Sequence, residues 1–367
     1  MIRVLHVLGG LNRGGAETIV MNLYRIIDKT KVQFDFIIHS ENETDYISEI
    51  KNLGGRIFIF PKFKGYNIIE YCTTWKKFLS EHSEYKILHS HVRSYASIFL
   101  PIANNFGLKT IVHSHSTSNG EGIKGTIKNF LQKPIASQAD FLFSCSTEAG
   151  RWLFGNDSIN NDNYYLVRNS IDINRYRFNE NIRNEYRRNL NLTNLTVYCH
   201  VGRLSEPKNH MFIIDIFKEI TKKEPNSMLL IVGDGELRND IESKIRKLNL
   251  QNKVILMGSR DDVEKILQAA DIFLFPSLWE GLPVSVIEAQ AAGLPTLVSN
   301  RVTKEVDISP CIKFLPIDHG IDIRVNKIMN MSKERLPKAE NFVISAGYDI
   351  SETSKWLLEF YRSLYYD

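Results

Sequence analysis

This chain of 367 residues contains few cysteines and no long apolar run. Its four cysteines (Cys72, Cys145, Cys199 and Cys311) lie far apart without CxxC spacing, which excludes a zinc ribbon or a dithiol redox motif. Three of them lie in or beside apolar runs, so we expect reduced thiols and a cytoplasmic protein. No run approaches the ~20 apolar residues of a spanning helix. The N-terminal apolar run lacks a cleavage site and leads into a glycine-rich turn, which indicates a first strand rather than a signal peptide.

Charge of one sign is also missing. The 46 basic and 42 acidic residues leave a net charge of +4, which is too small to indicate nucleic acid as a partner. It is compatible with an anionic small ligand or with peripheral contact to an anionic membrane. No Asp-x-Asp occurs, which argues against a metal-clamped diphosphate. We therefore expect cationic side chains and helix N-termini to neutralise any bound diphosphate, with no metal and no cofactor.

Short apolar strands alternate with helical patterns through the whole chain, which predicts parallel sheets with crossover helices. The pattern restarts near residue 196, after a polar region in which 155–165 is predicted to be a loop and 177–194 to be partly helical. We therefore predict two doubly wound Rossmann-like domains, residues 1–172 and 173–350, and an aromatic-rich amphipathic C-terminal helix that docks on a domain. The expected strands lie near residues 2–7, 33–39, 56–60, 87–90, 109–113, 141–144, 196–201, 227–232, 253–257, 272–275 and 295–298.

The first candidate site is the turn GGLNRGGAE at 9–17, between the first strand and the first helix. Gly14 and Gly15 let backbone N–H groups approach an anion at the helix N-terminus. The turn lacks the G-x-G-x-x-G spacing, and no Gly-Lys-Ser/Thr follows, so neither a dinucleotide-dependent oxidoreductase nor a P-loop is supported. A tight strand–helix turn without a ligand is the alternative.

The second and third candidates also follow strands. In HVGRLSEPKNH (200–210), Arg203 and Lys208 suit a diphosphate, and two solvated surface cations are the alternative. In IVGDGE (231–236), we expect Asp234 and Gly235 to be structural, with Gly233 near a ligand.

The fourth candidate is LWEGLPVSVIEAQAAGLP at 278–295. Pro283 suits the first helical position, and the N–H groups near Gly281 and Leu282 then point outward at the carboxyl end of a strand, where open α/β sheets bind ligands. Glu280 lies at the mouth. Glu288 lies in an apolar helix, where a carboxylate needs a partner. Ribose hydroxyls of a ligand are one candidate partner; a lysine or a backbone N–H from a neighbouring helix is the alternative.

Histidines recur in two strand-spaced pairs, His89/His91 and His113/His115, so each pair shares one face. A zinc site needs a third ligand and outer partners. Neither is visible in the sequence, which predicts no metal site.

Together, Gly-Gly-Ala-Glu, Gly-Arg-Leu-Ser-Glu-Pro-Lys-Asn, Gly-Asp-Gly and Pro-Ser-Leu-Trp-Glu-Gly-Leu-Pro-Val-Ser-Val-Ile-Glu-Ala resemble, in this order, the motifs of the retaining GT-B glycosyltransferases of family 4. The resemblance covers nearly the whole chain and is nearest to the branch that builds bacterial capsule, exopolysaccharide or O-antigen. It implies that the terminal helix, 351–367, returns to the first domain. The family's Asn-Gly-Val-Asp at the domain junction is Asn169-Ser170-Ile171-Asp172 here, a departure at the glycine that leaves the local backbone shape open.

The resemblance implies that a nucleotide sugar, with UDP as the expected nucleotide, is bound mainly by the second domain. Arg203 and Lys208 would hold the diphosphate, Glu280 the transferred sugar and Glu288 the ribose. Gly15 would approach the β-phosphate. His115 would be the active-site histidine, with His113 as the alternative. The implied catalytic residues are His115, Glu280, Arg203 and Lys208. The implied donor-binding residues are Gly14, Gly15, Gly202, Arg203, Lys208, Gly233, Gly258, Ser277, Glu280, Gly281, Leu282 and Glu288.

The resemblance further implies a glycan or polyprenyl-linked saccharide as acceptor. Segment 122–134, with Lys124 and Lys128 on one helical face and apolar residues nearby, is a candidate for peripheral contact with the inner membrane. A solvated helix that packs on its own domain is the alternative. Two other functions stay open: a nucleotide-sugar epimerase of the same fold, and a non-catalytic sugar-nucleotide-binding partner in a polysaccharide assembly complex.

Overall fold

The chain folds into two compact units. The computed structural model describes residues 1–366 apart from 13, 41–44 and 116–121. The first unit comprises Met1–Ser170 with Ile350–Asp367, and the second comprises Ile171–Asp349. This division falls two residues before the boundary expected at 172/173. None of the helices in the described part of the chain is both long enough and apolar enough to cross a membrane.

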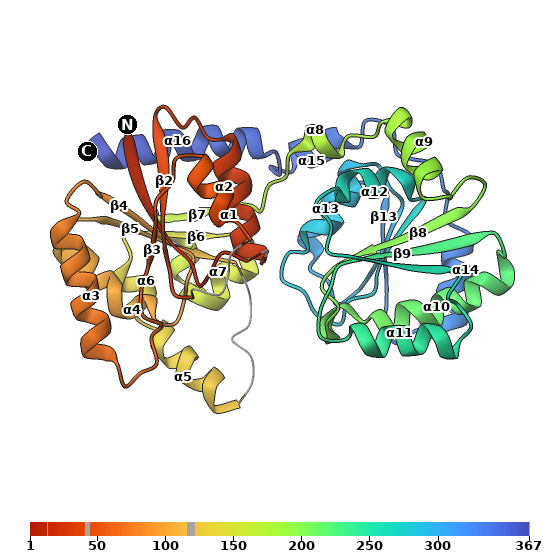
Figure 1. The fold of residues 1–367 in the computed structure, drawn as a ribbon, viewed down its shortest axis with the longest axis horizontal. Helices are drawn as coiled ribbons and strands as arrows, with labels where there is room; N and C mark the ends of the chain where they lie inside the picture. The colour runs from red at the N-terminus through yellow and green to blue at the C-terminus, as the bar shows by residue number, and fades with distance from the viewer. Residues whose placement is uncertain (13, 41–44, 116–121, 367) are drawn as a thin grey trace. The chain divides into compact units, whose positions relative to one another are not determined.

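The first unit is built on a seven-stranded parallel sheet in the order β3-β2-β1-β4-β5-β6-β7 (Figure 1). Helices cover both faces, which is why the strands are nearly continuous apolar runs. The strands are β1 (Ile2–Val7), β2 (Val32–Ile38), β3 (Ile57–Ile59), β4 (Ile87–Ser90), β5 (Lys109–Ser114), β6 (Phe141–Ser144) and β7 (Tyr164–Leu166).

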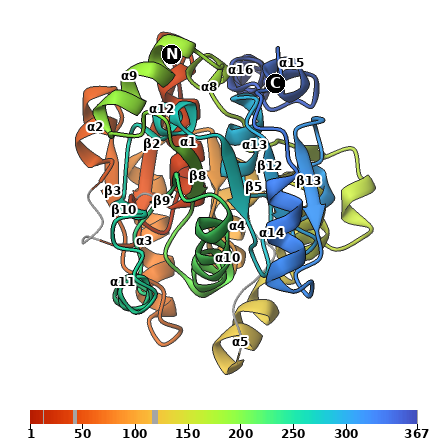
Figure 2. The ribbon, with the colours of Figure 1, turned by 90° about the vertical axis from the view of Figure 1, so that its right-hand side faces the viewer.

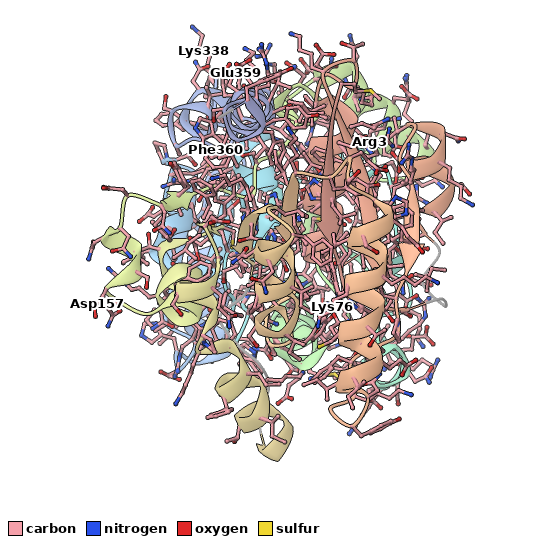
Figure 3. The ribbon with its side chains drawn as sticks, turned by 90° about the vertical axis from the view of Figure 1, so that its left-hand side faces the viewer. Arg3, Lys76, Asp157, Lys338, Glu359 and Phe360 are labelled. Carbon is pink, nitrogen blue, oxygen red and sulfur yellow. The ribbon has the colours of Figure 1, made fainter. Side chains whose placement is uncertain are left out.

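One core of this unit joins a face of the sheet to α1 (Gly15–Ile26) and α16 (Ile350–Tyr366). The core on the opposite face includes α3 (Ile68–Glu81) and α4 (Ala96–Asn105), which lie side by side; α3 carries the labelled Lys76 (Figure 3). The remaining helices of the unit are α2 (Ile47–Asn52), α5 (Gly122–Gln132), α6 (Ile135–Gln138), α7 (Thr147–Phe154) and the 3₁₀ turn η1 (Ser158–Asn160).

The second unit holds a six-stranded parallel sheet in the order β10-β9-β8-β11-β12-β13. Its strands are β8 (Thr196–Val201), β9 (Ser227–Val232), β10 (Val254–Gly258), β11 (Ile272–Phe275), β12 (Thr296–Ser299) and β13 (Ile312–Leu315). One core includes α8 (Ile173–Tyr176), α12 (Val263–Ala269), α13 (Val284–Ala291) and α15 (Glu340–Ser345). The other includes α10 (His210–Lys223), α11 (Arg238–Lys247) and α14 (Ile321–Met329), of which α10 and α14 lie side by side (Figure 2). The remaining elements are α9 (Glu180–Asn189), η2 (Glu206–Lys208) and η3 (Lys304–Val306).

The C-terminal helix α16 returns to the first unit, as its amphipathic pattern and the family resemblance led us to expect. Leu357, Leu358 and Tyr361 are buried in the core that also contains β1 and α1. The Tyr361 hydroxyl lies 2.7 Å from His89 Nδ1. Packing and a buried hydrogen bond therefore bring together two residues that lie 272 positions apart in the sequence.

Two parts of the strand prediction were incomplete. Residues 155–165 were predicted to be a loop, but Tyr164 and Tyr165 belong to β7, which pairs with β6 at the sheet edge. The Tyr164 hydroxyl also lies 2.6 Å from Ser144 Oγ. Strand β13 was missed as well, because edge strands this short carry little periodic signal.

Both sheets share one topological feature. The direction of strand order reverses between β1 and β4 in the first unit and between β8 and β11 in the second. Loops that leave such neighbouring strands diverge, and ligands of open α/β sheets bind in the resulting crevice at the carboxyl ends. These two positions are therefore the candidate ligand-binding sites of the two sheets.

Gly233, at the end of β9, has φ +133°, and a Cβ built there would lie 2.1 Å from the carbonyl oxygen of Gly202. We expect Gly233→Ala to lower the free energy of unfolding by more than about 2 kcal/mol, because backbone strain and the clash act together. Gly281→Ala is the control: a Cβ there meets nothing within 4 Å, so its effect should stay within about 0.5 kcal/mol. Urea unfolding measures both, and equal stabilities of the two variants would contradict the expectation.

Candidate functional site

Two loops meet at the switch point of the second sheet, residues 202–209 after β8 and 276–283 after β11. The Leu278 N–H donates to the Pro207 carbonyl at 2.8 Å, and Asn209 Nδ2 donates to the Pro276 carbonyl at 3.2 Å. These bonds hold the two predicted motifs against each other, although about 70 residues separate them in sequence.

An ion pair joins the two loops. Lys208 Nζ lies 2.6 Å from Glu280 Oε1, and the two side chains are only 18% and 15% exposed. The ammonium also lies 4.8 Å from the centre of the Phe275 ring, and the lysine stem passes over Gly202, where a Cβ would come within 3.1 Å of it. Since the pair is partly desolvated, removing one partner leaves the other charge in a poorly solvated place.

Arg203 lies on the same loop but in a different environment. Its side chain is 73% exposed and forms an ion pair of 3.1 Å with Glu236. Exposed pairs of this kind contribute little to stability. The alternative of solvated cations therefore describes the unliganded state of Arg203 but not that of Lys208.

Glu288, on α13, has a partner that the sequence did not reveal. The Tyr176 hydroxyl of α8 donates to Glu288 Oε1 at 2.6 Å. Burial raises the pKa of Glu288 to about 6, although the Tyr176 hydrogen bond and the charge of Arg175 act in the opposite direction. Among the described residues, neither a lysine nor a backbone N–H is the structural partner that was considered as the alternative. A single hydroxyl leaves most of the acceptor capacity of the carboxylate for a ligand.

The N-terminus of α13 points its free backbone groups into the same region. Pro283 is the N-cap residue, one position before the first helical position predicted for it. Within the described residues, no hydrogen bond is donated by the N–H groups of Gly281 or Leu282. Ser277 is fully buried, and its hydroxyl has no partner in the described part of the chain. Free N–H groups and the helix dipole together favour a bound anion here.

Gly233, directly after β9, and Gly258, the last residue of β10, have a structural role in the backbone. Gly233 and Gly258 form an antiparallel bridge in which the Gly233 N–H donates to the Gly258 carbonyl at 2.8 Å, and both have positive φ. Asp234 forms an ion pair of 2.9 Å with Arg238 and accepts a hydrogen bond from the Gly235 N–H. The structural reading predicted for Asp234 and Gly235 therefore extends to Gly233 and Gly258.

In the first unit, the turn 9–17 leads into α1. Gly14 is the N-cap residue and Gly15 is the first helical residue. A Cβ at Gly15 would meet nothing within 4 Å, whereas one at Gly14 would lie 2.2 Å from Glu17 Oε2. The contact at Gly14 is with the end of a flexible side chain that can shift, so local packing requires neither glycine, and the helix end at Gly15 stays open.

Imidazole rings gather at the carboxyl ends of β1, β4 and β5. His6 Nδ1 lies 3.0 Å from His91 Nε2, and His91 Nδ1 lies 2.9 Å from His115 Nε2. His89 and His113 stack beside them, with ring centres 5.5 Å apart. The expectation that no third ligand is available to either histidine pair was wrong, because strand pairing brings His6 to His89/His91 and brings His91 to His113/His115. His6 was not singled out in the sequence, since it has no neighbour at strand spacing.

Glu288 should make the protein less stable as pH rises. Since its folded pKa is raised from 4.5 to about 6, the folded state binds more protons than the unfolded state between these values, and stability falls as pH rises through this window. At neutral pH the penalty is about 2 kcal/mol.

We expect Glu288→Gln, whose amide oxygen still accepts from Tyr176, to raise the free energy of unfolding by up to about 2 kcal/mol at neutral pH, and the gain to vanish in acid. Urea unfolding over a pH series tests this. Glu219→Gln, which removes a surface partner of Lys222, is the control and should show no such window. A Glu288→Gln variant less stable than the parent at neutral pH would contradict the argument.

Comparison with known proteins assigns the family. The model of "Glycosyltransferase Family 4" matches residues 13–175, and that of "Glycosyl transferases group 1" matches residues 182–308. A putative glycosyltransferase of Bacillus subtilis, EpsF, is 33% identical over 371 residues that cover 98% of this chain and 96% of that protein. A UDP-Gal:alpha-D-GlcNAc-diphosphoundecaprenol alpha-1,3-galactosyltransferase of Escherichia coli is 44% identical over 110 residues, which cover 29% of this chain and 28% of that protein.

Among solved structures, HepE of Anabaena in complex with UDP-glucose superposes with a TM-score of 0.79 at 16% identity, covering 99% of this chain and 100% of that chain. At this identity the likeness concerns the fold alone. The twin parallel sheets are those of the GT-B architecture. From the full-length match to EpsF and the two family models, the chain belongs to the GT-B glycosyltransferases of family 4.

Proposed function

We propose that this glycosyltransferase moves a sugar from a UDP-sugar to a hydroxyl of a polyprenyl-linked saccharide, with retention of anomeric configuration, in the synthesis of a bacterial surface polysaccharide. The name of the Escherichia coli relative, which gives UDP-galactose as donor and a diphosphoundecaprenol-linked sugar as acceptor, supports the donor and acceptor classes.

The observation that carries the proposal is the Lys208–Glu280 ion pair at the open N-terminus of α13. Because the Glu280 carboxylate holds the Lys208 ammonium in place, the ammonium is already oriented before an anion binds. We propose that the donor diphosphate takes over the Lys208 ammonium, with Arg203 leaving its exposed partner Glu236 to join it. Glu280 is then free to accept hydrogen bonds from the transferred sugar.

Glu288 is proposed to hold the ribose. Its second oxygen and remaining lone pairs can accept hydrogen bonds from two vicinal hydroxyls, while Tyr176 fixes the first oxygen. Such bonds favour the ionised carboxyl, so the bound donor would offset the cost of burying this charge.

The transfer step develops negative charge on the β-phosphate as the bond to the sugar breaks. Lys208, Arg203 and the N–H groups near Gly281 are proposed to stabilise that charge without a metal ion, and Gly15 to contribute backbone N–H groups. Retention is proposed to follow from attack on the same face that the phosphate leaves, with the departing phosphate taking the proton of the acceptor hydroxyl. His115, or His113 as the alternative, is proposed to lie beside the transferred sugar.

We expect Lys208→Ala to lower kcat/KM for the UDP-sugar by roughly 2–4 kcal/mol of transition-state stabilisation, the range for a lost oxyanion donor. That is ~30- to 1000-fold in rate. Arg203→Ala should act in the same direction but less strongly, because its side chain is solvated at rest. Lys222→Ala, an exposed lysine paired with Glu219, is the matched control. Full turnover by the Lys208→Ala variant would overturn the assignment.

The same assay separates the alternatives. A panel of UDP-sugars is incubated with and without a polyprenyl-diphosphate-linked sugar. A transferase releases UDP in step with extension of the acceptor, whereas a nucleotide-sugar epimerase turns the donor over without an acceptor. A non-catalytic partner would bind UDP, as a rise in its unfolding midpoint shows, and convert nothing.

Access to a lipid-linked acceptor is proposed to involve α5. Ile127 and Phe130 are 55% and 70% exposed, and Lys128 is exposed on the same helix. If α5 only packed on its own domain, as in the alternative, the exposure of these two large apolar side chains would have no explanation. The side chain of Lys124 lies outside the described residues.

We expect the protein to float with vesicles that contain anionic lipid, and flotation to fall in high salt because the lysine contribution is screened. The double variant Ile127→Ser/Phe130→Ser should float less, while Ile323→Ser, a single exposed apolar residue of the second unit, should behave as the parent. Equal flotation of the double variant and the parent would exclude α5 as the contact.

A further inference from the structure

Five histidines occupy one face of the first sheet around its switch point. His6 pairs in register with His89 on the neighbouring strand, and His89 pairs with Ile111, two residues before His113. Residues two apart on a strand face the same side, so His91 and His115 continue the array beyond the strand ends. The rings face the side of the sheet that α1 and α16 cover, and a cavity of about 10 Å³ lies among them.

Several ring nitrogens in this array are buried without a hydrogen-bond partner among the described residues: His6 Nε2, His89 Nε2, His113 Nε2 and His115 Nδ1. Each such group destabilises the fold if nothing occupies it. The cavity is about the size of one water molecule, and a single water offers only two donors. A neutral imidazole nitrogen is also the commonest metal ligand in proteins.

Two sets of three nitrogens lie within 4.8 Å of one another, His6/His89/His91 and His91/His113/His115. They share His91, so one ion at a time satisfies the geometry. In the first set His6 and His89 are only 1% and 2% exposed, whereas His91 and His115 of the second set are both partly exposed. The second set is therefore the less enclosed of the two.

The second set also has outer partners. The His113 ring donates to the backbone of Val167, and His91 Nε2 lies 3.0 Å from His6 Nδ1. The Asn169 side chain lies near the His115 ring, although His115 Nδ1 has no hydrogen-bond partner among the described residues. Ligating histidines nearly always donate their second nitrogen in this way, which fixes the ring and its tautomer. His91 Nδ1, His113 Nε2 and His115 Nε2 then face the ion, which would replace the 2.9 Å contact between His91 and His115.

We propose that His91, His113 and His115 form a transition-metal site that takes Zn²⁺ through three nitrogens and keeps one coordination position open. No family motif assigns such a site, and it lies outside the donor-binding residues of the second unit. One consequence rests on the proposed function. An ion bound to His115 would prevent that ring from contacting the transferred sugar, so Zn²⁺ should inhibit transfer.

The test uses the full chain. Co²⁺, which substitutes for Zn²⁺, should give intense visible absorption bands at one equivalent, because three nitrogens and an open position impose a near-tetrahedral field. Zn²⁺ should displace it, and competition with a chromophoric chelator gives the affinity. His91→Ala, His113→Ala and His115→Ala should each weaken binding by at least the ~10- to 100-fold that loss of an outer partner costs. His82→Ala, which removes a partly exposed histidine beside Glu84, is the control.

Absence of the Co²⁺ bands in the unmutated protein would overturn the site without any variant having to fold. Loss of binding in His6→Ala and His89→Ala, with His113→Ala and His115→Ala unaffected, would overturn it in favour of the inner set. Zn²⁺ that binds at one equivalent and leaves transfer unchanged would support the site and exclude the role proposed for His115. Failure of transfer in metal-free protein would instead count against the proposed function.

Discussion

The arrangement of this enzyme depends on one constraint, the common direction of the strands in each sheet. Because all strands run parallel, their carboxyl ends meet at one edge, and only at the switch point do two neighbouring loops diverge. In the second unit the loops after β8 and β11 meet there through Leu278, Pro207 and Asn209. The Lys208–Glu280 pair, the free N-terminus of α13 and Glu288 all follow from that meeting. A fold with antiparallel strands would have distributed the same residues over two edges.

Several polar groups of the second unit lower the stability of the fold but are available to bind a ligand. Lys208 and Glu280 are desolvated against each other, Glu288 is ionised at neutral pH despite a raised pKa, and the Ser277 hydroxyl is buried without a partner in the described chain. Each of these is unfavourable for folding. The two large apolar cores on either face of the sheet offset them. Sites that must receive a charged ligand are where such costs are expected to remain.

Much of the architecture could be predicted from the sequence, since buried parallel strands are apolar runs and the restart near residue 196 marks the second sheet. The motif residues Arg203, Lys208, Glu280 and Glu288 were visible as well. The partner of Glu288 was not, because Tyr176 lies 112 residues away on a four-residue helix whose position depends on the whole second unit. Edge strand β7 was hidden by its polar flanks. Only part of the histidine array could be predicted from the sequence. The spacing showed two pairs, but the strand order β1-β4-β5 is needed to place His6, His91 and His115 in one row.

The two units share one strand order, but the side chains at their switch points differ in charge. The second has fixed charges, Lys208 and Glu280, and a helix end open to an anion. The first has imidazoles that burial keeps neutral, as the lowered pKa values of His6, His113 and His115 show. A neutral imidazole attracts a diphosphate weakly, but it accepts hydrogen bonds from hydroxyl groups and donates a lone pair to a metal ion. The division of chemistry thus suits an anionic donor on the second unit and uncharged sugar hydroxyls on the first. The same lone pairs make the first unit susceptible to a transition-metal ion, since the neutral imidazole is the form that ligates a metal.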